Sequence, residues 1–461
     1  MENKVVVLEN KLYFEELLAK GRAAQKEFEK FSQEDLDQAV KAIGKAVYDN
    51  AEELARMAVD ETGMGNYEDK IMKNKGKPKA VWYKLKGVKS RGIVKYHDLE
   101  GLVDVAKPMG VIGCVTPTTN PTMTPVQNAM IALKGGNAVI ISPHPRSKKT
   151  TAKTVHYMRE ALKEVGAPED LIQNIDEPSL ELSQMTMQLC DVCISTGGPA
   201  MVKSAYSSGK PAFGVGPGNV QCLVNKDADP NDYVPKVVRG RTYDNGVLCT
   251  CEQSLILPEK LYGETIEMLK EKGAHFIHES HEVDALRKTL FPEGRISPSM
   301  VGARPYDIAK AAGIEVPEDV KFLMVAIEKT GKDELLSKEK LAPVLAVYKY
   351  SGWKNAVEIA VTNLNNEGAG HSAVIHSDLK DDIEYASVLL PVSRIGIKMI
   401  GSSGLGGGFD NGLNPTATLG CGSWGNNSIS ENLWWNHLVN MSKIAYLMPE
   451  NKIPTDDEIW N

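Results

Sequence analysis

The fold is decided by an apolar segment, Gly110-Val111-Ile112-Gly113-Cys114-Val115-Thr116, after which strand-like and helix-like stretches alternate along the chain. The strand-like stretches of this part cover residues 110–116, 137–141, 171–175 and 192–196, with helices expected between them. This alternation predicts a parallel sheet with helices on both faces, the architecture that binds dinucleotides.

A second set of alternating strands and helices follows. Its expected strands are 221–224, 254–257, 322–327, 344–350, 372–375 and 395–400. Ahead of both sets, residues 1–75 are predicted to be helical, and residues 91–107 to form a hairpin that projects and bridges subunits. We therefore expect a nucleotide-binding domain over 1–222, a catalytic domain over 223–412 and a C-terminal segment over 413–461 that makes oligomer contacts.

The composition is that of an ordinary globular protein of 461 residues, with 42% hydrophobic and 25% charged side chains. A chain of this length exceeds one compact core. The net charge of -7 and the lack of basic runs predict no nucleic-acid partner. No apolar run reaches about 18 residues and no signal-peptide pattern is present, so we expect a cytoplasmic protein with no membrane partner. Seven cysteines, an odd number, favour free thiols over disulfides.

A candidate phosphate site follows the strand that ends at residue 196. There Thr196-Gly197-Gly198-Pro199 leads into a predicted helix, whose free backbone N–H groups and dipole attract anions. A tight turn without a ligand also needs glycine, so this pair alone is weak evidence. The dinucleotide pattern G-x-G-x-x-G is absent, because Gly214-Val215-Gly216-Pro217-Gly218 has another spacing, and the P-loop pattern fails at Ser208-Gly209-Lys210-Pro211.

A candidate nucleophile lies in Tyr243-Asp244-Asn245-Gly246-Val247-Leu248-Cys249-Thr250-Cys251. Cys249 follows a helix-like run and a glycine, and it precedes the apolar segment 254–257. A sharp loop at this junction leaves the thiol projecting, where a nucleophile is useful. The alternative is a small apolar residue in a core, which is common for an intracellular cysteine.

Six motifs carry a resemblance to a known family. They are Thr116-Pro117-Thr118-Thr119-Asn120-Pro121, Ser142-Pro143-His144-Pro145-Arg146, Ala205-Tyr206-Ser207-Ser208-Gly209-Lys210-Pro211, the Cys249 loop, Glu367-Gly368-Ala369-Gly370-His371 and Leu419-Gly420-Cys421-Gly422-Ser423-Trp424-Gly425. In these motifs, and over nearly its whole length, the chain resembles the CoA-acylating branch of the aldehyde dehydrogenase superfamily. The resemblance implies an α/β fold of two Rossmann-like domains with a bridging oligomerisation hairpin, in a homodimer or homotetramer.

The resemblance also implies a set of catalytic residues. Cys249 as thiolate would attack an aldehyde carbonyl, and the amide of Asn120 and the backbone N–H of Cys249 would stabilise the oxyanion. Hydride would then leave to a nicotinamide whose ribose is bound by Glu339. His371 is expected to assist proton transfer to or from the thiol. From residue type alone, Asn120 is a turn residue before proline, Glu339 is as readily a solvated charge, and His371 as readily a buried, hydrogen-bonded histidine.

The cofactor is expected to be NAD or NADP. Its implied contacts are Thr116, Pro117, Thr118, Thr119, His144, Arg146, Gly197, Gly198, Gly214 and Glu339. Many NAD-dependent relatives have a lysine and a glutamate after the second strand, and the glutamate is missing from residues 142–146. Without that acid, Arg146 or Lys148 could pair with the 2'-phosphate of NADP, while NAD stays the first choice on family grounds.

The type of reaction is predicted from a missing carboxylate. Hydrolytic aldehyde dehydrogenases have a glutamate before a glycine pair, but Phe213-Gly214-Val215-Gly216-Pro217-Gly218-Asn219 contains none. Water is a poor nucleophile without a base, whereas an ionised thiol attacks a thioester readily. The acyl group should therefore pass to coenzyme A as co-substrate, in a reversible reaction between a short aldehyde and its acyl-CoA.

Two cations are candidates for substrate binding. Arg241 and Lys398 lie near the catalytic loop and a late strand, which hints at an anionic aldehyde such as succinate semialdehyde or sulfoacetaldehyde. Both are equally surface or CoA-binding charges, and acetaldehyde stays open as a substrate.

No metal site is expected, and two rival functions remain. Cys190-x-x-Cys193 lacks a second pair, and His275, His278 and His281 should point to opposite faces of an extended segment. The rivals are a hydrolytic aldehyde dehydrogenase that needs no CoA and a catalytically silent nucleotide-binding scaffold. The missing carboxylate argues against the first, and the retained cysteine loop argues against the second.

Overall fold

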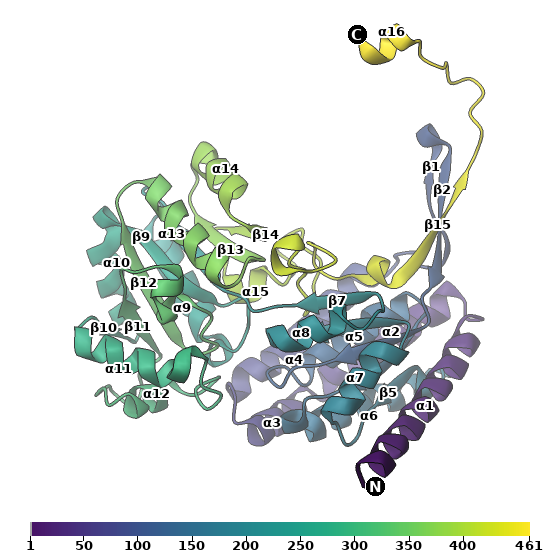
Figure 1. Ribbon diagram of the computed structural model, residues 1–461, viewed down its shortest axis with the longest axis horizontal. Helices are drawn as coiled ribbons and strands as arrows, with labels where there is room; N and C mark the ends of the chain where they lie inside the picture. Colours follow the sequence, from purple (N-terminus) through teal and green to yellow (C-terminus); the bar gives the residue numbers. More distant parts are fainter. Residues whose placement is uncertain (1) are drawn as a thin grey trace.

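The computed structural model describes residues 2–461, with side chains from residue 8 onward. Two parallel sheets and one small antiparallel sheet organise the chain (Figure 1). The first parallel sheet is built from residues 111–215 and the second from residues 220–397. The expected α/β class is confirmed, while the domain boundaries at residues 222 and 412 stay a prediction.

Four helices precede the first sheet. They are α1 (Glu2–Phe28), α2 (Gln33–Asp49), α3 (Ala51–Thr62) and α4 (Tyr67–Leu85). In α2 the apolar residues repeat at helical spacing, and Leu36, Val40 and Ile43 are fully buried in the core of the first sheet. Helix α4 begins after Asn66, whose side chain accepts a hydrogen bond from the N–H of Asp69 at 2.9 Å. This cap fixes where the lysine-rich α4 starts.

The first sheet has the strand order β5-β4-β3-β6-β7, and all neighbours are parallel. Its strands are β3 (Val111–Val115), β4 (Ala138–Ser142), β5 (Ile172–Asn174), β6 (Val192–Thr196) and β7 (Ala212–Val215). Its helices are α5 (Met123–Lys134), α6 (Lys148–Glu164), α7 (Leu180–Leu189) and α8 (Pro199–Tyr206). The chain order reverses between β3 and β6, which is where an open α/β sheet leaves a crevice for a ligand.

The second sheet has the order β10-β11-β12-β9-β8-β13-β14 and is also parallel. Its strands are β8 (Val220–Val224), β9 (Glu252–Pro258), β10 (Ala274–Ile277), β11 (Phe322–Ala326), β12 (Val344–Tyr350), β13 (Gly370–His376) and β14 (Val392–Ile397). Its helices are α9 (Pro230–Thr242), α10 (Glu259–Glu271), α11 (Ser280–Leu290), α12 (Pro305–Ala311), α13 (Trp353–Asn366), α14 (Lys380–Leu389) and the short α15 (Gly401–Gly404).

A small antiparallel sheet projects from the body (Figure 1). The predicted hairpin is confirmed as β1 (Gly92–His97) and β2 (Leu102–Pro108). A third strand, β15 (Val439–Ala445), pairs with β2, and the chain then runs outward to helix α16 (Asp456–Trp460). Whether this sheet bridges subunits stays a prediction.

The sequence missed three strands, β7, β10 and β15. In β7 the run contains Gly214 and is followed by glycines and a proline, so it resembles a loop, yet it pairs in register with β6. For β15 the partner strand lies more than 300 residues earlier, at Pro108 for Val439. Strands of this kind are fixed by tertiary pairing, which local periodicity does not reveal.

Candidate active site

The loop that holds Cys249 joins α9 to β9. After α9 ends at Thr242, the backbone is left-handed at Asp244 (φ 49°) and Asn245 (φ 52°), so the chain turns sharply before the cysteine. Cys249 is partly exposed, whereas Cys251 is fully buried. The Cys249 thiol therefore lies at a junction between elements and not inside a core layer.

Gly218 brings the Cys249 loop together with Glu339. Gly218 lies in the connection from the first sheet to the second, and a Cβ added to it would come within 2.2 Å of the carbonyl oxygen of Cys249. On its other side, the N–H of Gly218 donates to Oε1 of Glu339 at 3.0 Å. Burial, together with the neighbouring Glu367, raises the pKa of Glu339 to about 8.

The surroundings of Cys249 favour the neutral thiol. Burial raises its pKa first, and the charges of Glu339 and Cys421 raise it further. The guanidinium of Arg394 acts in the opposite direction and favours the thiolate. In the free protein the nucleophile is therefore mostly protonated at neutral pH.

His371 and Arg394 lie on the two last strands of the second sheet. His371 is fully buried at the start of β13, and neither of its ring nitrogens has a hydrogen-bond partner among the described residues. Burial and the charge of Arg394 lower the pKa of His371 to about 3, so the ring is neutral. Arg394 donates through Nη2 to the carbonyls of Gly420 and Ser430, the latter at 3.1 Å. It thereby holds the C-terminal segment against this edge of the site.

Asn120 lies in the turn after β3, and its orientation is set by a lysine. Nζ of Lys73, on α4, donates to Oδ1 of Asn120 at 2.8 Å. The amide NH2 of Asn120 donates to the hydroxyl of Thr119 at 3.2 Å. The amide oxygen is therefore occupied, and the NH2 group is the side that can serve a ligand.

The crevice between β3 and β6 has free polar groups. The hydroxyls of Thr118, after β3, and Thr196, at the end of β6, are shielded from solvent and have no partner in the described part of the chain. At Gly198, the residue that caps α8, a Cβ would meet no atom within 4 Å, so the backbone faces open space. Thr116, Pro117 and Gly197 lie at the same edge. This arrangement fits the phosphates and ribose of a dinucleotide.

The region after β4 contains a carboxylate that the sequence analysis did not predict. Nδ1 of His144 accepts a hydrogen bond from the N–H of Arg146 at 3.1 Å, and Lys148 pairs with Glu177 at 2.5 Å. An unpredicted carboxylate, Glu61 of α3, accepts from the N–H groups of Lys149 and Thr150 at 2.8 and 2.7 Å. An acid is therefore present at the start of α6, although it comes from another part of the chain.

The model of the aldehyde dehydrogenase family matches residues 7–284, which is more than half of the chain. The chain belongs to the aldehyde dehydrogenase family. The family and fold inferred from the sequence motifs are thereby confirmed.

Individual aldehyde dehydrogenases are similar over the whole chain. The succinate-semialdehyde dehydrogenase (acetylating) of Clostridium kluyveri is 47% identical over 98% of this chain and 100% of its own length. An acetylating aldehyde dehydrogenase from Geobacillus thermoglucosidasius superposes with a TM-score of 0.93 at 36% identity, covering 98% of this chain and 99% of that one. A propionaldehyde dehydrogenase of Rhodopseudomonas palustris, solved with bound CoA and an acylated cysteine, superposes with a TM-score of 0.84 at 26% identity, covering 94% and 97%.

Arg241 lies in helix α9 of this aldehyde dehydrogenase, and its role in substrate binding stays a prediction. The side chain is fully buried and donates to the carbonyls of Glu252 at 2.7 Å and Gly246 at 2.9 Å. These bonds tie α9 to both ends of the Cys249 loop. The separation of Arg241 from Cys249 along the chain does not indicate where the side chain points.

Lys398 and Gly214 are also bonded to other residues of the chain, and their predicted ligand contacts stay predictions. Lys398 lies beyond the end of β14 and pairs with Asp378 at 2.7 Å on the exposed rim, where its charge is already compensated. Gly214 is internal to β7, and its N–H is not free to donate to a ligand because it donates to the hydroxyl of Tyr206 at 2.8 Å. A Cβ at Gly214 would come within 2.7 Å of Val202, so glycine is needed there for packing.

Several functional candidates were missed by sequence reasoning. Lys70, Lys73 and Lys77 share one face of α4 at helical spacing, and that spacing was the one available signal. Burial lowers the pKa of Lys77 to about 8, while the charge of Cys249 opposes this shift. Its ammonium donates to the carbonyls of Gly406 at 3.0 Å and Thr416 at 3.2 Å. Lys77 is therefore a cation within electrostatic reach of the nucleophile.

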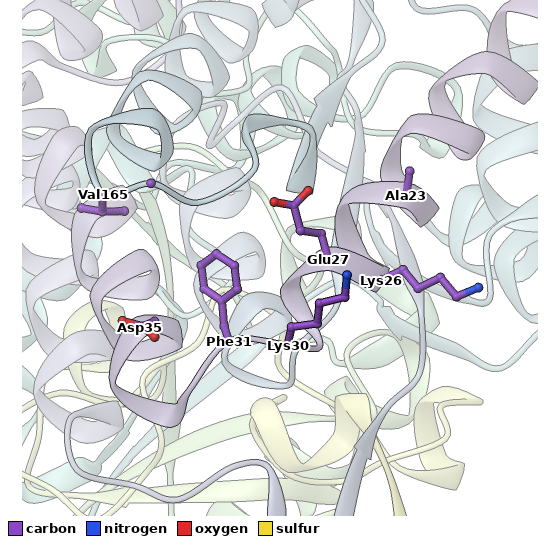
Figure 2. A pocket seen from close by; sticks show the side chains of 8 residues that line it. Ala23, Lys26, Glu27, Lys30, Phe31, Asp35 and Val165 are labelled. Atoms are coloured by element: carbon purple, nitrogen blue, oxygen red, sulfur yellow. The ribbon is translucent and has the colours of Figure 1, made fainter.

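A surface groove elsewhere does not compete with this site. It is lined by Ala23, Lys26, Glu27, Lys30, Phe31, Asp35, Val165 and Gly166 (Figure 2), and none of the site residues is among them.

The prediction of no metal site assumed that His275, His278 and His281 lie in one extended segment, and this local structure was wrong. His275 is in β10, but His281 is in helix α11, so the three histidines do not share one extended segment. Within residues 2–461, no cluster of three or more His, Cys, Asp or Glu side chains is placed to hold a metal. Over the same range, no helix has the length and apolarity needed to cross a membrane.

Proposed function

We propose that this protein is a CoA-acylating aldehyde dehydrogenase that uses Cys249 as its nucleophile and NAD or NADP as its oxidant. The observation that carries the proposal is the partly exposed residue Cys249, whose backbone packs against Gly218 in the connection between the sheets. The acylated cysteine and bound CoA of the related propionaldehyde dehydrogenase support the same chemistry here.

The reaction begins when the Cys249 thiolate adds to the aldehyde carbon. The carbonyl electrons move to oxygen, where the NH2 group of Asn120 and the N–H of Cys249 donate hydrogen bonds. The bound cofactor supplies a hydride acceptor, and loss of hydride leaves a thioester on Cys249. The thiolate of CoA then attacks the thioester carbonyl, Cys249 leaves as thiolate, and acyl-CoA is released. His371, whose ring nitrogens have no partner among the described residues, is the residue proposed to assist proton transfer to or from the thiol.

Hydrolysis is disfavoured by the state of Glu339. Its carboxyl lies close enough to Cys249 to raise the pKa of the thiol, so it is a candidate base toward water. Its pKa of about 8 keeps it mostly protonated at neutral pH, and its Oε1 is bonded to Gly218. A protonated carboxyl cannot take a proton from water. We therefore retain Glu339 as a ligand of the nicotinamide ribose.

The test is NAD reduction with a panel of short aldehydes, with and without CoA. We expect turnover that requires CoA, loss of turnover in Cys249→Ala and retention of turnover in Cys251→Ala, whose sulfur is buried. Turnover without CoA would favour a hydrolytic enzyme. Failure of every aldehyde to reduce NAD would favour a nucleotide-binding scaffold.

The proposed substrate is a short aldehyde with an anionic tail, and Lys77 is the proposed cation that recognises the tail. Two of its three N–H groups are used by the carbonyls of Gly406 and Thr416, which leaves one for a carboxylate or sulfonate. The succinate-semialdehyde dehydrogenase relative supports this class of substrate.

The substrate proposal is tested by comparing Lys77→Met with Lys398→Met. For Lys77→Met we expect kcat/KM to fall about tenfold or more for succinate semialdehyde but little for butyraldehyde, since one charge-assisted hydrogen bond contributes about 1.5–3 kcal/mol. Lys398→Met should leave both substrates unchanged. Equal losses on both aldehydes with Lys77→Met would count against recognition of an anion.

NAD is proposed as the preferred cofactor over NADP. The carboxylate of Glu61 occupies the first N–H groups of α6, beside the residues that follow β4. A 2'-phosphate in this region would meet that negative charge, whereas a ribose hydroxyl would not.

A homodimer or homotetramer is proposed, assembled through the projecting sheet. This part of the chain exposes apolar side chains at Tyr96, Met441, Ile444, Leu447 and Trp460. Exposed apolar surface of this kind marks an interface. Light scattering should give two or four chains for the wild type and a smaller assembly for Ile444→Lys; a monomeric wild type would contradict the proposal.

A further inference from the structure

Lys73 is held in a buried ionic cluster that contacts both the candidate oxyanion donor and the nucleophile loop. Its side chain is 4% exposed, and its ammonium is bonded to Asn120 and to the carboxylate of Asp244. Lys70, one turn earlier on α4, also bonds Asp244, at 3.1 Å, and is 5% exposed. The two lysines thus bond the same carboxylate, that of Asp244, and are equally buried. Among the described residues, Lys73 is hydrogen-bonded to Asn120 and Lys70 is not.

An ammonium group decides which way the amide of Asn120 points. Ammonium has three donors and no acceptor, so the atom of Asn120 that faces Lys73 must be the carbonyl oxygen. The opposite orientation would place two donors against each other in a buried site, which costs about 1–3 kcal/mol for an unsatisfied group. The contact therefore directs the NH2 group of Asn120 away from α4 and keeps it free to donate to a ligand.

Asp244 connects this contact to the nucleophile loop. It is fully buried, with its backbone in the left-handed region five residues before Cys249. Its N–H donates to Asp69 at 2.7 Å, and its Oδ1 accepts from the N–H of Asn66 at 2.9 Å. The start of α4 therefore anchors the Cys249 loop by two hydrogen bonds, and Lys73 extends that anchor to Asn120.

We propose that Lys73 is a positioning residue for the oxyanion of the acyl-transfer reaction: it fixes the amide of Asn120 and keeps that amide in register with the Cys249 loop through Asp244. The inference rests on the proposed function, since it acts through Asn120. Lys73 itself need not touch the substrate.

The experiment compares Lys73→Met with Lys70→Met in the NAD- and CoA-dependent assay. Methionine removes the charge and keeps the length, and in each variant the other lysine still pairs Asp244. For Lys73→Met we expect kcat to fall about 10²-fold with KM little changed, the effect typical of losing an oxyanion donor. Lys70→Met should lose a similar amount of thermal stability but much less kcat. Equal losses of kcat in both variants would mean a merely structural role.

The double variant with Asn120→Ala separates positioning from general support. If Lys73 acts through Asn120, adding Lys73→Met to Asn120→Ala should lower kcat little further. If the fold-loss of kcat in the double variant equals the product of the fold-losses in the two single variants, the inference is overturned. A wild-type kcat for Asn120→Ala would also overturn the inference, and it would remove Asn120 from the proposed mechanism. The proposed nucleophile is tested separately: loss of activity in Cys249→Ala would still support Cys249. If Lys73→Met fails to fold, Lys73→Gln, which is too short to reach both partners, replaces it with the same expected outcomes.

Discussion

Gly218 and Cys249 are in backbone contact so close that position 218 has no room for a side chain. A Cβ there would lie 2.2 Å from the carbonyl oxygen of Cys249 and 2.9 Å from its Cβ. The same glycine donates its N–H to Glu339. The connection between the two sheets therefore sets both the position of the nucleophile and the position of the expected ribose ligand.

Gly218→Ala should displace the Cys249 loop. Inserting a methyl group into a packed contact costs about 1–3 kcal/mol, and a shift of about 1 Å at a reacting atom can cost about 10²-fold in rate. We expect that loss in kcat/KM, measured by NAD reduction. Gly216→Ala is the matched control, because its Cβ would meet no atom within 4 Å. Equal activities of the two variants would refute the packing argument.

Alkylation of Cys249 should accelerate as the pH rises. Its pKa lies above the ordinary value for a thiol, so the reactive thiolate is a minor species at neutral pH. The rate constant of inactivation by iodoacetamide should then rise about tenfold per pH unit from about pH 6.5 to about 8.5. A rate that levels off within that range would show a thiol already ionised.

Glu339→Gln should make Cys249 more reactive, most of all at alkaline pH. The charge of Glu339 raises the pKa of Cys249, and with its own pKa of about 8 that charge is present mainly above pH 8. The ratio of variant to wild-type alkylation rates should therefore be near one at about pH 6.5 and rise toward about tenfold near pH 9. A ratio independent of pH would argue that Glu339 acts only by packing.

Glu252→Gln should flatten the dependence of stability on pH. Glu252 is fully buried, and burial raises its pKa from 4.5 to about 7. The folded state thus binds this proton more tightly than the unfolded state, so the stabilisation is complete below pH 4.5 and is lost as the pH rises through 7. The loss is on the order of 3 kcal/mol.

Thermal unfolding of the Glu252 variant gives the check. Between about pH 6 and pH 8.5, Tm should fall more for the wild type than for Glu252→Gln. The exposed Glu267→Gln should follow the wild type, since its side chain is 69% exposed. Parallel curves for all three proteins would rule out Glu252 as the titrating group.

Glu61→Gln should shift cofactor use toward NADP. The change removes a negative charge from the first turn of α6 and keeps the size of the side chain. We expect the ratio of kcat/KM for NADP to that for NAD to rise about tenfold, which corresponds to about 1.4 kcal/mol of removed repulsion. Glu52→Gln, which removes an exposed carboxylate of the same helix α3 that pairs with Lys75, is the control. An unchanged ratio would place the 2'-hydroxyl away from Glu61.

Some residues of the candidate site could be found from the sequence, and others could not. Cys249, Asn120, His371 and Glu339 were reached through motifs in which neighbouring residues carry the signal. Arg241 was reached too, but its buried contacts were not foreseen, because a helix position does not tell whether an arginine faces solvent or buried carbonyls. Lys73 and Glu61 were missed, since each acts on a residue 47 or 89 positions away and no local pattern marks such a pair.

The sequence by itself determined the alternation of strands and helices, the sharp loop before Cys249 and the absence of a carboxylate from residues 213–219, because each follows from short-range periodicity or from residues adjacent in the chain. Only the tertiary structure decided that β15 joins the hairpin, that Glu61 caps α6, and that Lys73 directs the amide of Asn120. The physical reason is that strand pairing and buried charge pairs are formed by segments that folding brings together, and these segments are selected by geometry and burial after the local elements exist.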